Sequence, residues 1–349
     1  MRLTPKPAIA LLVATVLTAA ALPRRERSVN PVDGKEKALG TLSEYGFFVG
    51  PLADLAPAEG VLPYALNTPL FSDYAEKARF VRLPPGGTMG YREGEVLDLP
   101  VGSFLIKNFY YPVDARDPAR GRRIVETRLL KHTERGWLAW GYVWNDEQTE
   151  AHYSPLGTKT EVVWTDLTGE QRTIEYEAPN QFQCKGCHSF EGVLRPIGPS
   201  ARQLHGGAGD YLARWHAAGL LTGAPDNPAD WPVMDWRAPG TSVELRARAY
   251  LDANCGYCHR PEGPAGSSGL FLQASYETGP ETGVRKAPVA AGRGSGGRKY
   301  DILPGKPDKS ILVHRLESTD PAVRMPEVGR TQVHAEGLAL VREWIEGME

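Results

Sequence analysis

Two copies of the pattern Cys-x-x-Cys-His contain every cysteine of the chain, and they constrain its fold more than any other feature. The first copy runs from Cys184 to His188 and the second from Cys255 to His259. Two thiols on one tight turn can form thioether bonds to the two vinyl groups of a single porphyrin, and the imidazole that follows can ligate its iron. The sequence therefore predicts two covalently bound haem c groups.

The pattern also predicts a role for each residue. A zinc site built from two Cys-x-x-Cys knuckles is one alternative, and disulfides in an exported chain are another. Neither alternative accounts for the histidine that follows each pair, so we favour haem attachment. The expected site residues are Cys184, Cys187, Cys255 and Cys258 for the porphyrins and His188 and His259 for the irons.

The first 22 residues have the layout of a secretory signal peptide. Arg2 and Lys6 precede an apolar stretch from Ala8 to Leu22, and Ala19-Ala20-Ala21 offers small residues for cleavage. The stretch nearly reaches spanning length, so an uncleaved anchor is the alternative. In both cases we expect the body of a bacterial chain in the periplasm, tethered to the membrane only if this segment is retained.

Charge argues against nucleic acid as a partner. The formal net charge of the 349 residues is −2, and no dense Lys/Arg cluster occurs in the body of the chain. A nucleic-acid binder needs a basic face.

Strand signals dominate the first half of the chain from Val61 onward. In Leu138–Trp144 large and small residues alternate, which places the large ones on one face of a sheet. We interpret this half as an antiparallel β domain, a sandwich or an open barrel. The expected strands are Val96–Tyr111, Ile124–His132, Gly136–Trp144, Glu161–Thr165 and Gln171–Glu177.

The period of the apolar residues becomes helical after the first motif. The second motif then has the layout of a small cytochrome c module, with a helix before it, a long loop after it and a closing helix at the C-terminus. The predicted fold class is α+β, an N-terminal antiparallel β domain followed by an α-helical cytochrome c domain. The expected helices are Gly209–Leu221, Val243–Ala253, Asp308–Glu317 and His334–Met348.

Five segments follow from these signals. They are a signal peptide (1–22), an irregular segment (23–60), a β-rich domain (61–182), the first haem motif with a helix and connector (183–240), and a cytochrome c-like domain (241–349).

Met325 is the expected sixth ligand of the second iron. It precedes Pro326 in a polar loop before the last helix, where cytochrome c modules carry their distal ligand, and a thioether ligand raises the reduction potential. A methionine more often fills a hydrophobic core, but Met325 lies in a polar loop, where a core role is a poor explanation for it. His314 and His334 are competitors that we expect on helix surfaces. The first iron has Met234, His205 and His216 as candidates, or a vacant sixth position.

Cations on the predicted strands have two interpretations. Arg79, Lys107 and Lys131 are either solvated or in contact with haem propionates.

Several stretches resemble an uncharacterised bacterial family of di-haem c-type cytochromes with a β-rich N-terminal region. The resemblance implies haem binding and electron transfer, and it covers nearly everything after the signal. The C-terminal third separately resembles class I cytochrome c domains. The stretches are Leu66–Tyr74, Tyr142–Gln148, Pro179–Cys184, Arg195–Pro199 and Arg324–Arg330.

Three classes of function are compatible with these features. The first is a periplasmic electron carrier between a donor dehydrogenase and a respiratory acceptor, such as a cytochrome or oxidase. The second is a peroxidase-like redox enzyme with an open iron site at the first haem. The third is a β domain that binds a sugar or another ligand through Trp140, Tyr142 and Trp144, with the haems as a relay. Large residues on one face of a strand more often belong to the core of the sheet.

Overall fold

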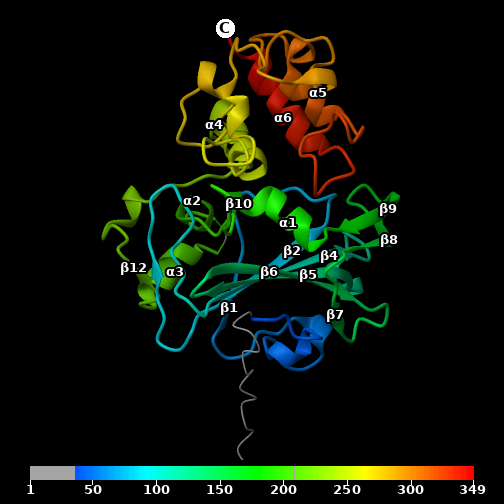
Figure 1. Cartoon of the computed structure of the whole chain (residues 1–349), viewed down its shortest axis with the longest axis vertical. Coiled ribbons are helices and arrows are strands. Elements are labelled where there is room, and N and C mark those ends of the chain that lie inside the picture. Colours follow the sequence, from blue (N-terminus) through cyan, green and yellow to red (C-terminus); the bar gives the residue numbers. More distant parts are fainter. Residues whose placement is uncertain (1–35, 208) are drawn as a thin grey trace, which may run out of the picture. The chain divides into compact units, whose positions relative to one another are not determined.

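The computed structural model describes residues 36–207 and 209–349, and Ala38–Glu349 form one compact unit (Figure 1). The expected signal peptide at residues 1–22 lies outside the described residues. Among the described helices, none is long and apolar enough to cross a membrane.

A six-stranded antiparallel sheet, with strand order β1-β2-β4-β5-β6-β7, is the largest element. Its strands are rich in β-branched and aromatic residues, which fit a pleated and half-buried surface. The expected α+β class with a large antiparallel sheet is therefore confirmed. The strands are β1 (Val61–Tyr64), β2 (Glu76–Arg82), β4 (Phe104–Pro112), β5 (Arg122–Thr133), β6 (Gly136–Trp144) and β7 (Ala151–Tyr153).

Strand β4 begins later than the alternating pattern predicts. The expected strand Val96–Tyr111 is interrupted because Pro100 has no N–H to donate and Gly102 adopts φ 94°, outside the strand region. Residues before this break bond elsewhere: Leu97 N–H donates to the Pro199 carbonyl at 2.9 Å. Nearby, the short strand β3 (Met89–Gly90) pairs in parallel with β12 (Leu221–Thr222).

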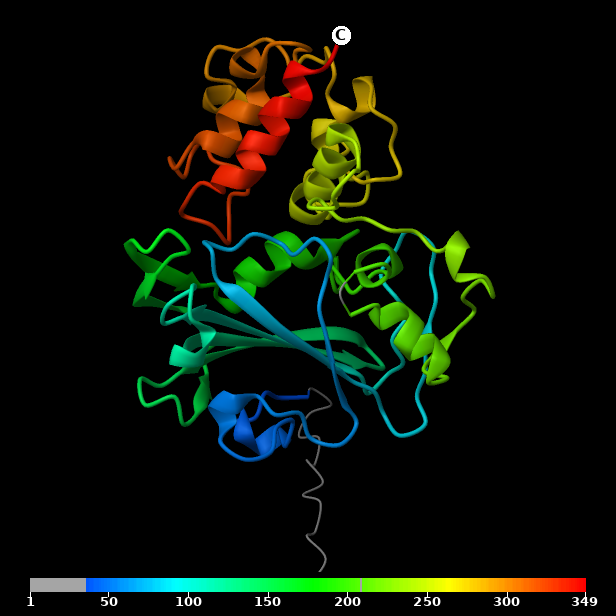
Figure 2. The same ribbon diagram turned by 180° about the vertical axis from the view of Figure 1, so that it is seen from behind.

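One face of the sheet is apolar and is covered by residues 38–60. Phe80, Ile106, Leu129 and Trp140 are cross-strand neighbours on this face, and they form a buried cluster with residues such as Phe47. Residues 38–60 contain two short 3₁₀ turns, Ser43–Tyr45 and Leu52–Asp54, and lie beneath the sheet in Figures 1 and 2.

The stripe Trp140, Tyr142 and Trp144 belongs to this covered face. Their exposed fractions are 6%, 0% and 7%, so the stripe is core and presents no aromatic platform to solvent.

Helices α1, α2 and α3 and the β8–β9 hairpin pack on the opposite face of the sheet. Leu204 of α2 and Trp215 of α3 pack on Val81 and Leu105, and Tyr176 of the β8–β9 hairpin packs near Phe109. Helix α1 contacts β6. The elements are β8 (Thr158–Thr165), β9 (Gln171–Ala178), α1 (Gln181–His188), β10 (Ser189–Phe190), β11 (Val193–Leu194), α2 (Ala201–Leu204) and α3 (Tyr211–Ala217).

Three helices form a second core in the C-terminal part: α4 (Val243–Leu251), α5 (Ile311–Glu317) and α6 (Ala335–Glu346). Leu251, Val313 and Val341 are fully buried there. The predicted helices Val243–Ala253, Asp308–Glu317 and His334–Met348 are thus present with shorter ends. Asp308 lies in a preceding 3₁₀ turn rather than at the start of α5, whose N-cap residue is Ser310.

Short turns connect these helices. After α4 the chain passes through η5, a π-helical turn (Asp252–Gly256) that leads into the second motif. The remaining turns are η3 (Pro118–Arg120), η4 (Pro228–Asp230), η6 (Gly266–Ser268), η7 (Pro280–Thr282), η8 (Gly292–Ser295) and η9 (Pro307–Lys309).

Buried polar contacts join the segment before β2 to the helical core. The Asp73 carboxylate accepts hydrogen bonds from the N–H groups of Thr331 and Gln332, each at 2.8 Å. The Phe71 N–H donates to Asn254 Oδ1 at 2.8 Å. These contacts tie the segment before β2 to the turn that contains Asn254 and to the loop before α6.

Candidate functional site

The first Cys-x-x-Cys-His motif forms the second half of helix α1. Asn180 caps this helix: its Oδ1 accepts hydrogen bonds from the N–H groups of Phe182 (3.0 Å) and Gln183 (2.9 Å). The Gln183 side chain accepts in return from the Asn180 N–H, which completes a capping box. Because residues three and four apart are neighbours on a helix, both cysteines and the histidine of the motif share one face.

The His188 imidazole has one nitrogen committed to the backbone. Its Nδ1 lies 2.9 Å from the carbonyl oxygen of Arg195. Burial lowers the pKa of His188 to about 4, because the protein interior disfavours the charged ring. A neutral ring that donates from Nδ1 to a carbonyl keeps a free lone pair on Nε2, as metal-ligating histidines do.

The second motif starts inside the π-helical turn η5 and has a matching histidine. Cys255 is buried in the helical core, and burial raises the pKa of its thiol to about 12. The His259 Nδ1 lies 3.2 Å from the Leu270 carbonyl, and burial lowers the pKa of this ring to about 4 as well. Both histidines are therefore neutral at pH 7 with Nε2 available.

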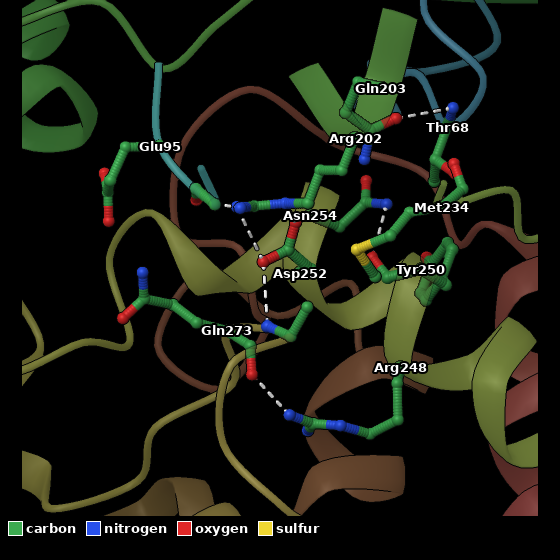
Figure 3. A network of polar contacts seen from close by, with 12 residues as sticks. Thr68, Glu95, Arg202, Gln203, Met234, Arg248, Tyr250, Asp252, Asn254 and Gln273 are labelled. Atoms are coloured by element: carbon green, nitrogen blue, oxygen red, sulfur yellow. Dashed lines mark hydrogen bonds and ion pairs between the residues drawn. The ribbon is translucent and has the colours of Figure 1, made fainter. Parts of the chain in front are cut away.

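A polar network holds the turn that carries Cys255 (Figure 3). The Asp252 carboxylate accepts hydrogen bonds from Arg202 Nε at 3.0 Å and from the Ala274 N–H at 2.9 Å. A Cβ on Gly256 would lie 3.2 Å from the Gln273 Cα, so a larger residue would require the segment around Gln273 to move by a few tenths of an ångström. The glycine between the two thiols thus has a packing reason.

The two motifs meet, although they are far apart in the sequence. The Cys258 thiol lies 3.9 Å from the carbonyl oxygen of Gly186, between the first pair of thiols. A hydrogen bond from Cys258 lowers the pKa of Cys187 to about 7 and raises that of Cys258. All four thiols are free. The two expected attachment points are therefore neighbours.

A cavity of about 1680 Å³, part of it open to solvent, lies at this junction. Cys184, Cys187 and His188 line it from α1, and Tyr257 lines it from the second motif. Residues of the sheet strands β1, β2, β4, β5 and β6 line it as well. Because His188 faces this space, it keeps some accessible surface while lying deep in the protein.

The sheet wall of the cavity is cationic. Arg79, Lys107 and Arg128 are direct cross-strand neighbours on β2, β4 and β5, and all three line the cavity. Arg79 is only 6% exposed, and its Nη2 has no hydrogen-bond partner among the described residues. Lys131 is on the opposite face, because it is three residues beyond Arg128 on the same strand. Of the three cations singled out in the sequence, two reach the cavity wall.

The residues present fit a covalently attached haem. The donor set comprises two free thiols at the required spacing and a neutral imidazole with a free nitrogen. The wall combines apolar residues such as Leu66 and Ile197 with the buried guanidinium of Arg79, whose Nη2 has no hydrogen-bond partner among the described residues. An apolar macrocycle with carboxylate substituents matches both kinds of lining.

Met325 lies in a loop beside α5. Its N–H donates to the Arg315 carbonyl at 3.0 Å, and its own carbonyl accepts from Arg330 Nε at 2.9 Å. Arg330 is buried, and its guanidinium also bonds the carbonyls of residues 315, 316, 318 and 332. The charge of Arg315 also contributes to the lowered pKa of His259, after burial of the ring.

The three candidates for a sixth ligand of the first iron do not line the cavity. Met234 packs against the helical core, His205 bonds Asp210 at 3.0 Å, and His216 lies against Trp231. The structure thus does not bring any of the three to the first motif.

His334 is not on a helix surface, contrary to the expectation from the sequence. Its ring stacks on Phe71 with centroids 4.2 Å apart, and its Nδ1 lies 3.1 Å from the Tyr250 hydroxyl. It is the residue before α6, so the side chain points into the aromatic cluster beside the helix. His314 is half-buried on α5.

A zinc site would require three or four converging side chains. Among residues 36–207 and 209–349, no group of three or more His, Cys, Asp or Glu side chains is arranged to hold a metal ion.

Comparison with known proteins found no match. No family model matches the chain, no curated protein matches it, and no solved structure matches it.

Proposed function

We propose that this chain is an exported di-haem c-type cytochrome that carries electrons between a donor dehydrogenase and a respiratory acceptor. One observation carries the proposal: the two Cys-x-x-Cys-His motifs adjoin, with the Cys258 thiol 3.9 Å from the Gly186 carbonyl oxygen between the first pair of thiols. Carriers with two haems need their redox groups close together, and adjoining attachment points meet that need.

Attachment requires no oxidant. Each thiol of a motif would add across one vinyl group of a haem, which would form a sulfur–carbon bond and place the thiol hydrogen on the other vinyl carbon. When bound, the haems supply one-electron redox chemistry at iron. The chain contributes His188 and His259 as proximal ligands, each oriented by a backbone carbonyl.

The finer fold assignment is part of this proposal. Helix α4, the turn with Cys255, the long loop, Met325 and helix α6 follow one another as in a class I cytochrome c domain. The packing of α4 on α6 through Leu251 and Val341 supports it. Met325 is the proposed sixth ligand of the second iron.

The test is a pyridine haemochrome count on the exported full-length protein, with a Cys184→Ser/Cys187→Ser variant as its partner. We expect two haems in the wild type and one in the variant. A wild-type chain with no covalent haem would contradict the proposal. Equal haem content in the two proteins would show that the first motif does not attach a haem.

A second candidate is a haem enzyme with an open first iron. It is favoured by one observation: the cavity adjoins His188, while Met234, His205 and His216 lie elsewhere. Carbon monoxide distinguishes the two functions. A shift of the reduced visible spectrum that is lost in the Cys184→Ser/Cys187→Ser variant would favour the enzyme, and no shift would favour the carrier.

A further inference from the structure

A row of three cations crosses the sheet at the cavity wall. Arg79, Lys107 and Arg128 lie directly opposite one another on three adjacent strands, at a spacing where like charges repel. Burial and the neighbouring cations hold the pKa of Lys107 well below its usual range. Such a row is costly unless anions neutralise it.

Within residues 36–207 and 209–349, one end of this row is neutralised. Glu126 binds Arg128 through two hydrogen bonds of 2.6 and 2.8 Å, and the Tyr176 hydroxyl donates to the same carboxylate at 2.7 Å. Lys107 faces the ring of Phe109, with its Nζ 4.7 Å from the centroid. Arg79 keeps Nη2 unbonded within the described part of the chain. Among the described residues, neither Arg79 nor Lys107 forms an ion pair with a carboxylate, so this end of the row has no acidic partner.

The same cavity contains the first pair of thiols and an apolar lining. Cys184 and Cys187 face it from α1. Apolar residues such as Leu66, Leu105 and Ile197 line it beside the cations. A ligand that suits this lining has an apolar body and carboxylates, and is joined to the thiols.

We infer that Arg79 and Lys107, with Arg128 beside them, form a carboxylate-binding site that holds the propionates of the haem attached through Cys184 and Cys187. This inference rests on the proposed function. A guanidinium and an ammonium at adjacent positions suit carboxylate oxygens through charge-assisted hydrogen bonds. Carboxylates bound there would favour the protonated form of Lys107, and the positive charges close to the first haem would then favour its reduced state.

The experiment compares Arg79→Gln and Lys107→Gln with Lys131→Gln in the full-length exported protein. Lys131 is the matched control, because it is on the same sheet but on its opposite face. Redox titration measures both haems, and the second haem serves as an internal reference. Resonance Raman spectra report the propionate bending band, whose frequency depends on hydrogen bonding to the carboxylates.

We expect the potential of the first haem to fall in both cavity variants, and the propionate band to move to lower frequency. Lys131→Gln leaves both readouts unchanged, and Arg79→Lys restores much of the potential because the charge remains. Lys107→Gln keeps the test decisive if Arg79→Gln folds poorly.

Three results would overturn the inference. Two haems per chain with unchanged potentials and Raman bands in both cavity variants would refute the propionate site and leave the proposed function intact. A saturable spectral response to added acetate, lost in Arg79→Gln, would assign the row to a free carboxylate instead. A wild-type chain without haem would refute the inference and the proposed function together.

Discussion

Met325 is held in its loop by backbone bonds on both sides, so replacing its side chain leaves the loop in place. We predict that Met325→Ala lowers the potential of the second haem and turns its iron high-spin or histidine-ligated, because the thioether is lost. Redox titration and visible spectra measure both effects. Met234→Ala is the control, since Met234 packs on the helical core. Unchanged spectra and potential in Met325→Ala would end this assignment.

His334 makes stability depend on pH. Burial lowers its pKa from 6.5 to about 4, opposed by Glu336 and assisted by the charges of Arg237 and Lys77. Above pH 6.5 the ring is neutral in both the folded and the unfolded chain. As the pH falls from 6.5 toward 4, the unfolded chain takes up a proton that the folded chain excludes. The free energy of unfolding therefore decreases, by up to about 3 kcal/mol.

Denaturant titrations at pH 7 and pH 4.5 measure this decrease. In His334→Gln we expect a smaller loss of stability on acidification than in the wild type. His152→Gln is the control, because His152 is exposed. We expect this variant to lose as much stability on acidification as the wild type. Equal losses in the wild type and His334→Gln would show that other groups dominate.

At the scale of single elements, α1 depends on its cap because its residues are exposed or half-buried, with little packing to stabilise it. Asn180→Ala removes the acceptor of two N–H groups and is expected to cost about 1 kcal/mol. We predict lower haem occupancy at the first motif, measured by mass spectrometry of the peptide containing Cys184.

Ser242→Ala is the matched control for the second motif. Ser242 caps α4 by accepting a hydrogen bond from the Leu245 N–H at 3.2 Å, so its loss carries a similar cost. It should leave the first motif fully occupied. Equal occupancy at the first motif in both variants would contradict a local role for the α1 cap.

At the scale of the whole molecule, Asp73 joins the segment before β2 to the loop that follows Met325. Its carboxylate is buried and accepts from two backbone N–H groups and the Thr331 hydroxyl. Asp73→Ala leaves these donors unpaired, so we expect a loss of about 3 kcal/mol in the free energy of unfolding. Hydrogen exchange of the Thr331 and Gln332 amides should rise at the same time.

Asp146→Ala is the comparison for this prediction. Asp146 is highly exposed and forms a surface ion pair with Arg123, so its removal is expected to change stability by well under about 1 kcal/mol. Similar losses in the two variants would argue against Asp73 as a link between the two parts.

Local patterns were sufficient for the elements themselves. The alternation in Gly136–Trp144 and the apolar period of His334–Met348 predicted β6 and α6, because both depend on residues close in sequence. Pro100 and Gly102 shortened the expected strand before β4, and these residues are visible in the sequence.

The sequence by itself determined the chemistry expected of each motif, since two thiols and an imidazole at fixed spacing need no distant partner. Only the tertiary structure decided what surrounds them. The meeting of Cys187 with Cys258, and the row of Arg79 with Lys107, both join residues far apart in the chain. Their positions follow from strand register and helix packing, where a shift of one residue moves a side chain to the other face. For the same reason Lys131, which looks equivalent to Lys107 in the sequence, lies on the opposite side of the sheet.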